Sequence, residues 1–498
     1  MIRLRRLSDV RATGDLVWFQ RALDRLRALR HDVDPRLQGF FSDASPLYIA
    51  RAPGRLDVMG GIADYSGARV LELPLECSTA ALLQRQATAR CDLATRRAGG
   101  WQFFSADLPP LVERDGALST AAALAAWFAG RESDRWASYV MGIVQLCLQR
   151  AVREGRGRTP GLRLLIDSTV PEGRGVASSA ALEVAAGAAV AASLADDMTE
   201  TDLAAACQEV ENHVVGAPCG IMDQITSACG RHDRLLRLRC QPGTIEGYLE
   251  IPAGYRFYGI DSGVSHAVSG ADYETVRTAA FMGYRMIAAA AGLPVQREGG
   301  RLRIDDPRWG GYLANLTGPE WAALARGLPE EIAGGEFLER YGGITDTVTA
   351  VHSERRYPVR PATEHPVREQ ARVDRVATLL GVLADEPQAA VELGRLMCDS
   401  HRSYGACGLG SDGTDRLVEL VAAEGPERGL FGAKITGGGS GGTVAVFGRR
   451  DAAALVRDVA TRYGAETGRE TGVFTSSGPG AAETGVLLLE PDDMSGGY

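Results

Sequence analysis

The sequence predicts a chain of two or three domains in which helices and strands are mixed, and three observations support this. The 498 residues exceed what a single simple core usually organises. A hydrophobic content of 45% with 23% charged residues is ordinary for a globular protein. From about residue 48 onward, strand-like apolar runs alternate with alanine-rich stretches at helical spacing.

The first element is an N-terminal helical extension, which we expect over residues 1–45. Apolar side chains recur in it at intervals of three and four, at Leu16, Phe19, Leu23, Leu26 and Leu29. The stretch FFSDASP then interrupts this pattern, so the extension ends before the next strand-like run begins.

The middle of the chain is expected to alternate strands and helices. A strand is predicted over 162–170 and an alanine-rich helix over 180–195. A second helix follows over 200–216, capped by Thr199 or Thr201. The pattern then predicts a strand over 255–263, a helix over 272–292 and, after a glycine-rich loop, a short strand that ends near residue 448.

Two segments are predicted to be less regular. Residues 295–370 are rich in Arg, Pro, Gly and acidic residues, and we interpret them as an insertion or a lid. The tail PDDMSGGY, residues 491–498, is expected to be disordered.

Composition excludes several classes of protein. A net charge of −9 argues against a nucleic-acid partner, since no broad basic face can neutralise phosphates. The start lacks the apolar core of a secretory signal, and the most apolar long run carries Glu183, so no membrane partner is expected. Nine scattered cysteines without CxxC pairs predict reduced thiols and a cytoplasmic protein. The seven dispersed histidines show no metal-ligand spacing, so a catalytic metal would have oxygen ligands.

Lysine is nearly absent from the chain. Of the 54 lysines and arginines, Lys434 is the single lysine, for which biased codon usage is the simplest explanation. A Walker A lysine or a protein-kinase strand lysine is therefore excluded everywhere except at position 434.

Two glycine-rich loops are candidates for phosphate binding. VPEGRGVASSA (170–180) lies between a predicted strand and a predicted helix, where unpaired N–H groups and the helix dipole favour an anion. The alternative is a glycine turn with a serine N-cap. TGGGSGG (436–442) contains G-x-G-x-x-G but precedes a strand, which is the wrong context for a dinucleotide site. We interpret it as a close-packed turn near a ligand phosphate.

These loops do not occur alone. RAPGRLDVMGG, VPEGRGVASSA and KITGGGSGG together resemble the motifs of the GHMP small-molecule kinases, and GAPCGIMDQ narrows the resemblance to the galactokinase-like branch. Within that branch, roughly residues 45–485 are similar to plant kinases of L-arabinose. The large region that precedes the kinase part of those proteins has no expected counterpart in the roughly 45 residues before the first motif.

The resemblance implies a two-lobed α+β fold with the active site in the cleft between the lobes. The N-terminal, ATP-binding lobe would span 46–212 and the C-terminal lobe 213–490. ATP and Mg²⁺ are the implied cofactors. The ATP phosphates would lie on one continuous stretch, made of Gly173, Arg174, Gly175, Val176, Ala177, Ser178, Ser179 and Ala180.

The resemblance also implies the catalytic roles. Ser179, or its neighbour Ser178, would hold Mg²⁺ together with Glu211. Asp223 would be the base for the anomeric hydroxyl, or would only orient it. Arg55 would orient Asp223 and stabilise charge on the transferring phosphoryl group. Trp136 resembles the adenine-side tryptophan of galactokinases, with a core aromatic as the alternative.

The sugar is suggested by one short stretch. Galactokinases carry GEHTDY where this chain has GGIADY (60–65), so Asp64 matches the aspartate that binds ring hydroxyls. Tyr273 and Gly220 match other sugar contacts. Gly61 and Ile62 replace the polar pair beside the exocyclic end, where the glutamate bonds the 6-hydroxyl. L-Arabinopyranose lacks that hydroxymethyl group, so a site without its polar partner suits the pentose.

We therefore expect an ATP-dependent sugar 1-kinase that converts L-arabinose to L-arabinose 1-phosphate. The alternatives are a galactokinase, a kinase of another galacto-configured sugar, and a catalytically silent sugar sensor. The expected partners are a small-molecule sugar and ATP, and the oligomeric state stays open.

Overall fold

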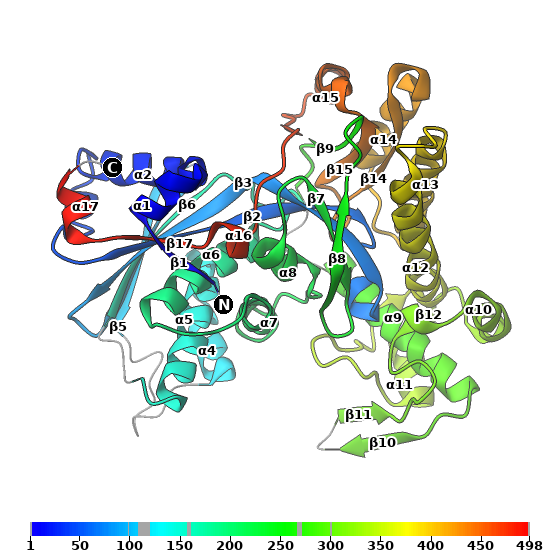
Figure 1. Cartoon of the computed structure of the whole chain (residues 1–498). Coiled ribbons are helices and arrows are strands. Elements are labelled where there is room, and N and C mark those ends of the chain that lie inside the picture. Colours follow the sequence, from blue (N-terminus) through cyan, green and yellow to red (C-terminus); the bar gives the residue numbers. More distant parts are fainter. Residues whose placement is uncertain are drawn as a thin grey trace.

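Two long neighbouring strands join the two lobes of the protein. In the computed structural model, residues 2–97, 99–107, 120–156, 161–265, 271–298 and 301–496 are described. Strands β2 (Leu47–Met59) and β3 (Arg69–Gln86) pair antiparallel and run from one lobe toward the other (Figure 1). The α+β fold with two lobes that the sequence predicted is confirmed.

The larger sheet belongs to the first lobe and has nine strands. Their order is β1-β17-β2-β3-β6-β4-β5, and β7 pairs with both β3 and β8. The remaining bounds are β1 Leu4–Arg6, β4 Arg90–Arg97, β5 Gly100–Asp107, β6 Gly161–Ser168, β7 Arg234–Arg239, β8 Thr244–Glu250 and β17 Val486–Leu489. Strands β7, β8 and β17 follow residue 213 in the chain but pair with strands that precede it. A single boundary at 212/213 therefore does not separate the two sheets.

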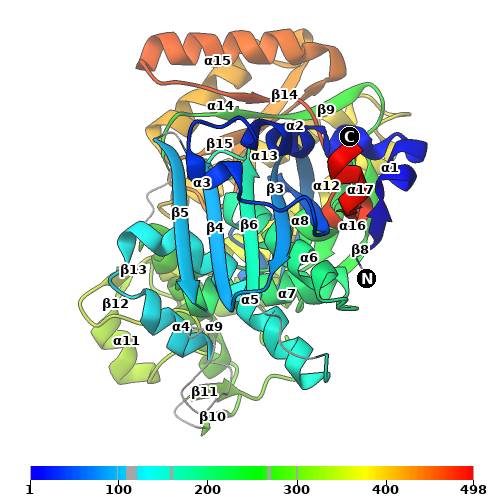
Figure 2. The same cartoon turned by 90° about the vertical axis from the view of Figure 1, so that its left-hand side faces the viewer.

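Five helices cover one face of this sheet (Figure 2). They are α4 Ala121–Phe128, α5 Arg135–Arg153, α6 Ser178–Ser193, α7 Glu200–Val210 and α8 Met222–Cys229. Helix α6 consists mostly of alanine, valine and glycine, and these small side chains let its neighbours approach closely. A Cβ atom at Gly187 would lie 2.6 Å from Leu203 and 2.8 Å from Ile143. The alanine-rich run is thus a buried central helix, in which Ala180 and Ala181 of the first turn are fully buried.

The opposite face of the sheet is covered by the N-terminal segment together with the C-terminal tail. The helices are α1 Leu7–Thr13, α2 Gln20–Leu29, α3 Pro35–Gln38 and α17 Pro491–Gly496. Arg21 and Arg25 on α2 both pair with the buried Asp167 of β6. The expectation of a disordered tail was wrong for residues 491–496, because α17 forms and buries Met494, which is 2% exposed, in the same apolar cluster, whereas residues 497 and 498 lie outside the described part of the chain.

The second lobe is built on a four-stranded sheet with the order β14-β15-β9-β16. Its strands are β9 Tyr255–Asp261, β14 Leu430–Ile435, β15 Thr443–Arg449 and β16 Val473–Phe474, and its main helices are α12 Val359–Val382, α13 Ala389–Ala406, α14 Asp412–Glu424 and α15 Ala453–Thr467. Helix α13 lies against β14, where a Cβ at Gly394 would be 2.0 Å from the Phe431 carbonyl oxygen. This close approach fixes the distance between α13 and β14.

The segment 295–370, expected to be irregular, contains ordered elements that pack in the apolar core of the second lobe. They are β10 Val295–Glu298, β11 Arg301–Ile304, α10 Gly318–Leu324, β12 Ile332–Ala333, α11 Gly334–Tyr341, β13 Arg356–Tyr357 and the start of α12. Trp309, Phe337 and Tyr357 pack there against α9 (Ala271–Ala290). All nine cysteines are free thiols. Among the described helices, none is long and apolar enough to cross a membrane.

Candidate active site

Arg55 and Asp223 form the central ion pair of the site. Arg55 lies on β2, and Asp223 lies in the first turn of α8. The guanidinium donates through Nε and Nη2 to the two Asp223 oxygens, at 2.8 and 3.0 Å, and through Nη1 to the Gly175 carbonyl, at 2.6 Å. The side chain of Arg55 is 3% exposed and that of Asp223 is 22% exposed. Arg55 therefore fixes the orientation of the Asp223 carboxylate, which stays partly exposed to solvent.

Acidic neighbours keep Arg55 charged despite its burial. Burial alone disfavours the cation, but the carboxylates of Asp223, Glu72 and Asp57 outweigh it and raise the pKa of Arg55 above its ordinary value. Glu72, on β3, lies 3.4 Å from the Arg55 Nε, and neither of its carboxylate oxygens accepts a hydrogen bond from the described residues. Burial raises the pKa of Glu72 well above its usual range. Sequence patterns gave no signal for this acid.

The first glycine loop ends at the N-terminus of α6. Gly173 and Gly175 have φ of 68°, and Ala177 caps the helix in the left-handed conformation with φ of 59° and no side-chain hydrogen bond. Ser178 begins the helix, so neither serine is its N-cap. The backbone N–H groups at this helix start are the donors that an anion would meet.

The rest of this loop is tied to both lobes. The Val176 carbonyl accepts the Arg55 N–H at 3.1 Å, and the Arg174 carbonyl accepts the Thr443 hydroxyl at 2.8 Å. The Arg174 guanidinium lies 3.4 Å from Asp261 of β9. Ala180 is fully buried on α6. The structure thus places residues 173–180 beside the Arg55–Asp223 pair.

Ser179 and Glu211 come together as the resemblance implied. Glu211 opens a short π-helical turn, Glu211–Val215, and accepts a hydrogen bond from Gln224 Nε2 at 2.7 Å. Burial raises the pKa of Glu211 to about 7, against the opposing hydrogen bond from Ser179. Glu183, one helical turn beyond Ser179, is fully buried and also close to Glu211.

This acidic cluster fits a divalent cation. In the described part of the chain, no arginine, lysine or histidine forms an ion pair with Glu183 or Glu211. Burial raises the pKa of Glu183 well above its usual range, and the charge of Glu211 adds to the effect. Hydroxyl and carboxylate oxygens are the ligands that Mg²⁺ prefers. The donor set of Ser179 and Glu211 is therefore suited to Mg²⁺.

Asp64 lies close to the catalytic pair. It begins a short turn after β2 and is 4% exposed. Burial, with the negative charge of Asp223, raises the pKa of Asp64 to about 6. A Cβ at Gly220 would lie 1.6 Å from Asp64 Oδ2, so only glycine permits this approach. The Tyr273 ring, half-buried on α9, meets the Tyr65 ring edge-on with centroids 5.8 Å apart.

Arg277 is a site residue that sequence reasoning missed. It donates through Nε and Nη2 to the two oxygens of Asp346, at 2.8 and 2.9 Å, and through Nη1 to the Cys219 carbonyl at 2.9 Å. The pair is buried, with side chains 7% and 4% exposed. Arg277 therefore links the segment after α11 to the loop that ends at Gly220. Its spacing of four from Tyr273 on α9 was the one available signal.

The space beside Gly61 and Ile62, which the sequence predicted to lie at the exocyclic end of the sugar, is closed. A Cβ at Gly61 would lie 1.9 Å from the Tyr404 hydroxyl and 2.1 Å from Asp57 Oδ2, so a side chain there has no room. Ile62 has φ of 50° and is 1% exposed, packed in the apolar core of the second lobe. The apolar side chain fills a core and presents almost no surface to a ligand.

Trp136 also differs from its expected role. It is the second residue of α5, is 7% exposed, and packs in the apolar core under the large sheet. Its position corresponds to the core-aromatic alternative.

The second glycine loop packs against the first. It connects β14 to β15, and four of its glycines, Gly437, Gly439, Gly441 and Gly442, have positive φ. A Cβ at Gly437 would lie 2.8 Å from the Gly175 carbonyl, and one at Gly442 would lie 2.8 Å from the Arg174 carbonyl. The second glycine loop thus packs directly against the first, in agreement with the predicted close-packed turn.

Comparison with known proteins assigns the family. Residues 138–231 match the GHMP kinases N terminal domain, and residues 384–466 match the GHMP kinases C terminal domain. The fold, the paired glycine loops and these two matches define the class: the chain contains the N-terminal and C-terminal domains of the GHMP kinases.

Individual relatives of the chain are named as sugar kinases. The chain is 38% identical to the L-arabinokinase of Arabidopsis thaliana, over 97% of this chain and 51% of that protein, so it spans about half the length of this relative. It is 28% identical to the galactokinase of Chloroflexus aggregans, over 85% of this chain and 90% of that protein. The structure of Lactococcus lactis galactokinase complexed with galactose has the same fold, with a TM-score of 0.66 at 18% identity, covering 93% of this chain and 98% of that one.

Proposed function

We propose that the protein is an ATP- and Mg²⁺-dependent sugar 1-kinase that phosphorylates the anomeric hydroxyl of L-arabinose. The observation that carries the phosphoryl-transfer part is the Arg55–Asp223 pair, held at 2.8 and 3.0 Å beside the glycine loop at the start of α6. Transfer of a phosphoryl group to a hydroxyl needs a cation, a partly exposed carboxylate and donors for the phosphates, and this site brings the three together.

Each side chain then has a defined task. Asp223 takes the proton that the anomeric hydroxyl loses as its oxygen bonds to the γ-phosphorus, while the bond from that phosphorus to the bridging oxygen breaks and ADP leaves. Arg55 holds that carboxylate in one orientation and places positive charge beside the transferring group. Ser179 and Glu211 would hold Mg²⁺, which would neutralise negative charge on the ATP phosphates. Asp64 accepts hydrogen bonds from ring hydroxyls next to Asp223.

The choice of L-arabinose is supported by two features. The first is the 38% identity to L-arabinokinase, which exceeds the 28% identity to galactokinase. The second is the closed space at Gly61, where the Tyr404 hydroxyl and the Asp57 carboxylate leave no room for a side chain that could bind an exocyclic hydroxyl. A site that offers no hydrogen-bond partner to the exocyclic hydroxyl gains no binding free energy from a hexose and can bind the pentose.

The experiment is an ADP-release assay with L-arabinose, D-galactose, D-galacturonate and D-glucuronate. We expect the highest kcat/KM with L-arabinose and weaker turnover of D-galactose, since an apolar or closed site rejects an added hydroxyl only modestly. Asp197→Ala, which changes an acid whose side chain is 70% exposed, is the matched control for acid substitutions. Preference for D-galactose would make the protein a galactokinase, and no ADP release with any sugar would favour a silent sensor.

A further inference from the structure

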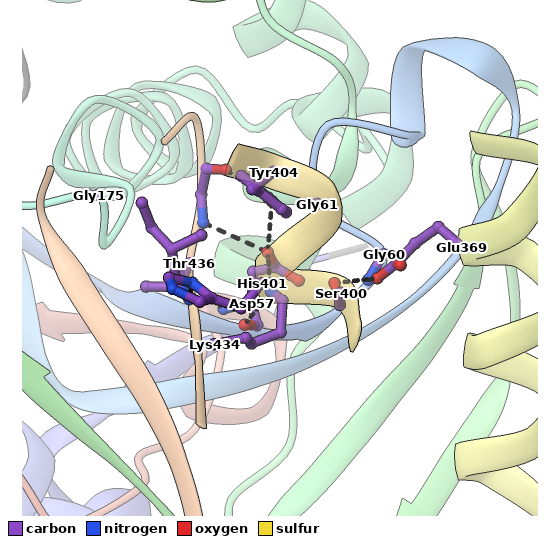
Figure 3. Close-up of polar contacts among 12 residues, drawn as sticks. Asp57, Gly60, Gly61, Gly175, Glu369, Ser400, His401, Tyr404, Lys434 and Thr436 are labelled. Atoms are coloured by element: carbon purple, nitrogen blue, oxygen red, sulfur yellow. Dashed lines mark hydrogen bonds and ion pairs between the residues drawn. The ribbon is translucent and has the colours of Figure 1, made fainter. Parts of the chain in front are cut away.

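The single lysine of the chain lies in the fully buried centre of the second lobe. Lys434 is on β14, two residues before the second glycine loop, and is 0% exposed. Its ammonium donates to Asp57 Oδ2 at 2.8 Å and to the Asp57 carbonyl at 3.3 Å (Figure 3). Asp57 is also 0% exposed. A chain that uses arginine at its other 53 basic positions therefore places a lysine where a compact cation faces one buried carboxylate.

Asp57 uses the same oxygen to hold the second glycine loop. Its Oδ2 accepts the Gly437 N–H at 3.3 Å and lies 3.2 Å from the Tyr404 hydroxyl, which also donates to the Gly437 carbonyl at 2.9 Å. The Asp57 N–H donates to the Thr436 hydroxyl at 2.8 Å. Both polar backbone groups of Gly437 are thus fixed by side chains from outside the loop.

Gly437 in turn touches the catalytic loop. A Cβ there would lie 2.8 Å from the Gly175 carbonyl and 3.2 Å from Arg55 Nη2. The Gly175 carbonyl is the acceptor for Arg55 Nη1 at 2.6 Å. A contiguous path of contacts therefore runs from Lys434 through Asp57 and Gly437 to the loop where phosphates are proposed to bind.

Helix α13 fixes the other side of this cluster. Tyr404 lies on it with its ring 5.3 Å from the Lys434 ammonium, and His401 Nδ1 accepts the Ile435 N–H at 3.3 Å. Ser400 donates to Glu369 Oε1, which also accepts the Gly60 N–H. Helix α13 thus contacts the second glycine loop directly and reaches Gly60 through Glu369 of α12 (Figure 3).

We propose that Lys434 is a positioning residue: by neutralising Asp57 it lets that carboxylate and Tyr404 clamp the Gly437 peptide, which sets Gly175 and Arg55 for phosphoryl transfer. The role rests on the proposed kinase function. Without the ammonium, Asp57 would be a buried charge with no cation at 2.8 Å, and its hold on Gly437 would change. Lys434→Met is consequently a poor test by itself, since the variant is prone to unfold.

The single lysine offers a direct measurement on the intact chain. Protein labelled with [15Nζ]lysine gives one side-chain ammonium signal, and we expect it to shift by more than its line width when Mg²⁺ and a nonhydrolysable ATP analogue are added. Calorimetry on the same sample measures nucleotide binding independently. A signal that stays in place although calorimetry shows binding overturns the positioning role. Absence of nucleotide binding would instead refute the proposed function.

A tyrosine pair provides the kinetic test. Tyr404→Phe removes the hydroxyl that clamps Gly437 but keeps the ring, and we expect kcat to fall fivefold or more with little change in the sugar KM. Tyr258→Phe is the matched control, because this equally buried hydroxyl donates to the carbonyls of Arg449 and Arg450 at the other end of the sheet. Equal kcat values for the two variants would overturn the proposal.

Discussion

Replacing Asp64 by asparagine tests whether this carboxylate binds the sugar as an anion. Burial and the charge of Asp223 raise the pKa of Asp64 to about 6, and the hydrogen bond from the Tyr65 backbone and the charge of Arg277 only partly offset them. Asp64 Oδ1 accepts no hydrogen bond from the described residues, so a sugar hydroxyl is the partner that the site offers it. With this pKa, about 9% of Asp64 is ionised at pH 5 and about 91% at pH 7, so the apparent sugar affinity should rise about tenfold.

The assay is calorimetric titration of L-arabinose without nucleotide between pH 5 and 8. We expect about tenfold tighter binding at pH 7 than at pH 5, levelling off above pH 7, and release of protons on binding near pH 6. Asp64→Asn should bind weakly with no such pH dependence, whereas Asp197→Asn should keep the parent profile. A flat profile in the parent protein, or full affinity in Asp64→Asn, would refute the reasoning.

The same substitution has an opposite effect on stability. The rise in the pKa of Asp64 from 3.8 to about 6 corresponds to about 3 kcal/mol that favours the protonated folded state. This stability is present below the unfolded pKa and is lost as pH rises through 6. Asp64→Asn removes the buried charge, so its free energy of unfolding at pH 7.5 should exceed that of the parent, by up to about 3 kcal/mol. The difference should shrink at pH 4, as measured by urea unfolding.

Three further predictions concern the surroundings of this carboxylate. Gly61→Ala should lower the free energy of unfolding by about 1–3 kcal/mol, because its Cβ meets the Tyr404 hydroxyl at 1.9 Å; urea unfolding checks this, and an unchanged midpoint would contradict it. Glu211→Gln should weaken Mn²⁺ binding in the presence of ADP by roughly tenfold or more, measured by the EPR signal of free Mn²⁺; equal binding would exclude it as a ligand. Asp346→Asn should raise the KM for L-arabinose severalfold with a smaller effect on kcat, since Arg277 loses its bidentate partner; an unchanged KM would show that this pair does not shape the sugar pocket.

Local patterns predicted the elements that carry the phosphate-binding candidates. The strand at 162–170, the alanine-rich helix after it and the glycine loop between them appear as β6, α6 and the loop at 173–180, because each depends on spacing within a few residues. The resemblance brought Arg55 and Asp223 together although 168 positions separate them in the chain. The distances between these side chains come from the structure, because a sequence motif does not contain them.

The errors arose where distant segments decide the environment of a residue. The motif around Gly61 did not predict that the space beside it is closed by Tyr404, which lies on α13 more than 300 positions away. Codon usage was offered for the rarity of lysine, and nothing in the sequence indicated that Lys434 pairs with Asp57, which lies 377 positions earlier in the chain. Met494 belongs to a short polar tail, and it packs in an apolar cluster with the N-terminal helices, which are distant in the chain. Such pairings depend on tertiary packing, which a single sequence does not reveal.

The central claim is that Asp223 and Arg55 transfer a phosphoryl group from ATP to the anomeric hydroxyl of L-arabinose. The most direct measurement is 31P NMR of the reaction mixture, which distinguishes a sugar 1-phosphate from inorganic phosphate. The parent protein should form L-arabinose 1-phosphate and ADP in equal amounts, and Asp223→Ala should form neither while still binding the nucleotide. Product formation by Asp223→Ala at the parent rate, or inorganic phosphate as the phosphorus product, would contradict the account.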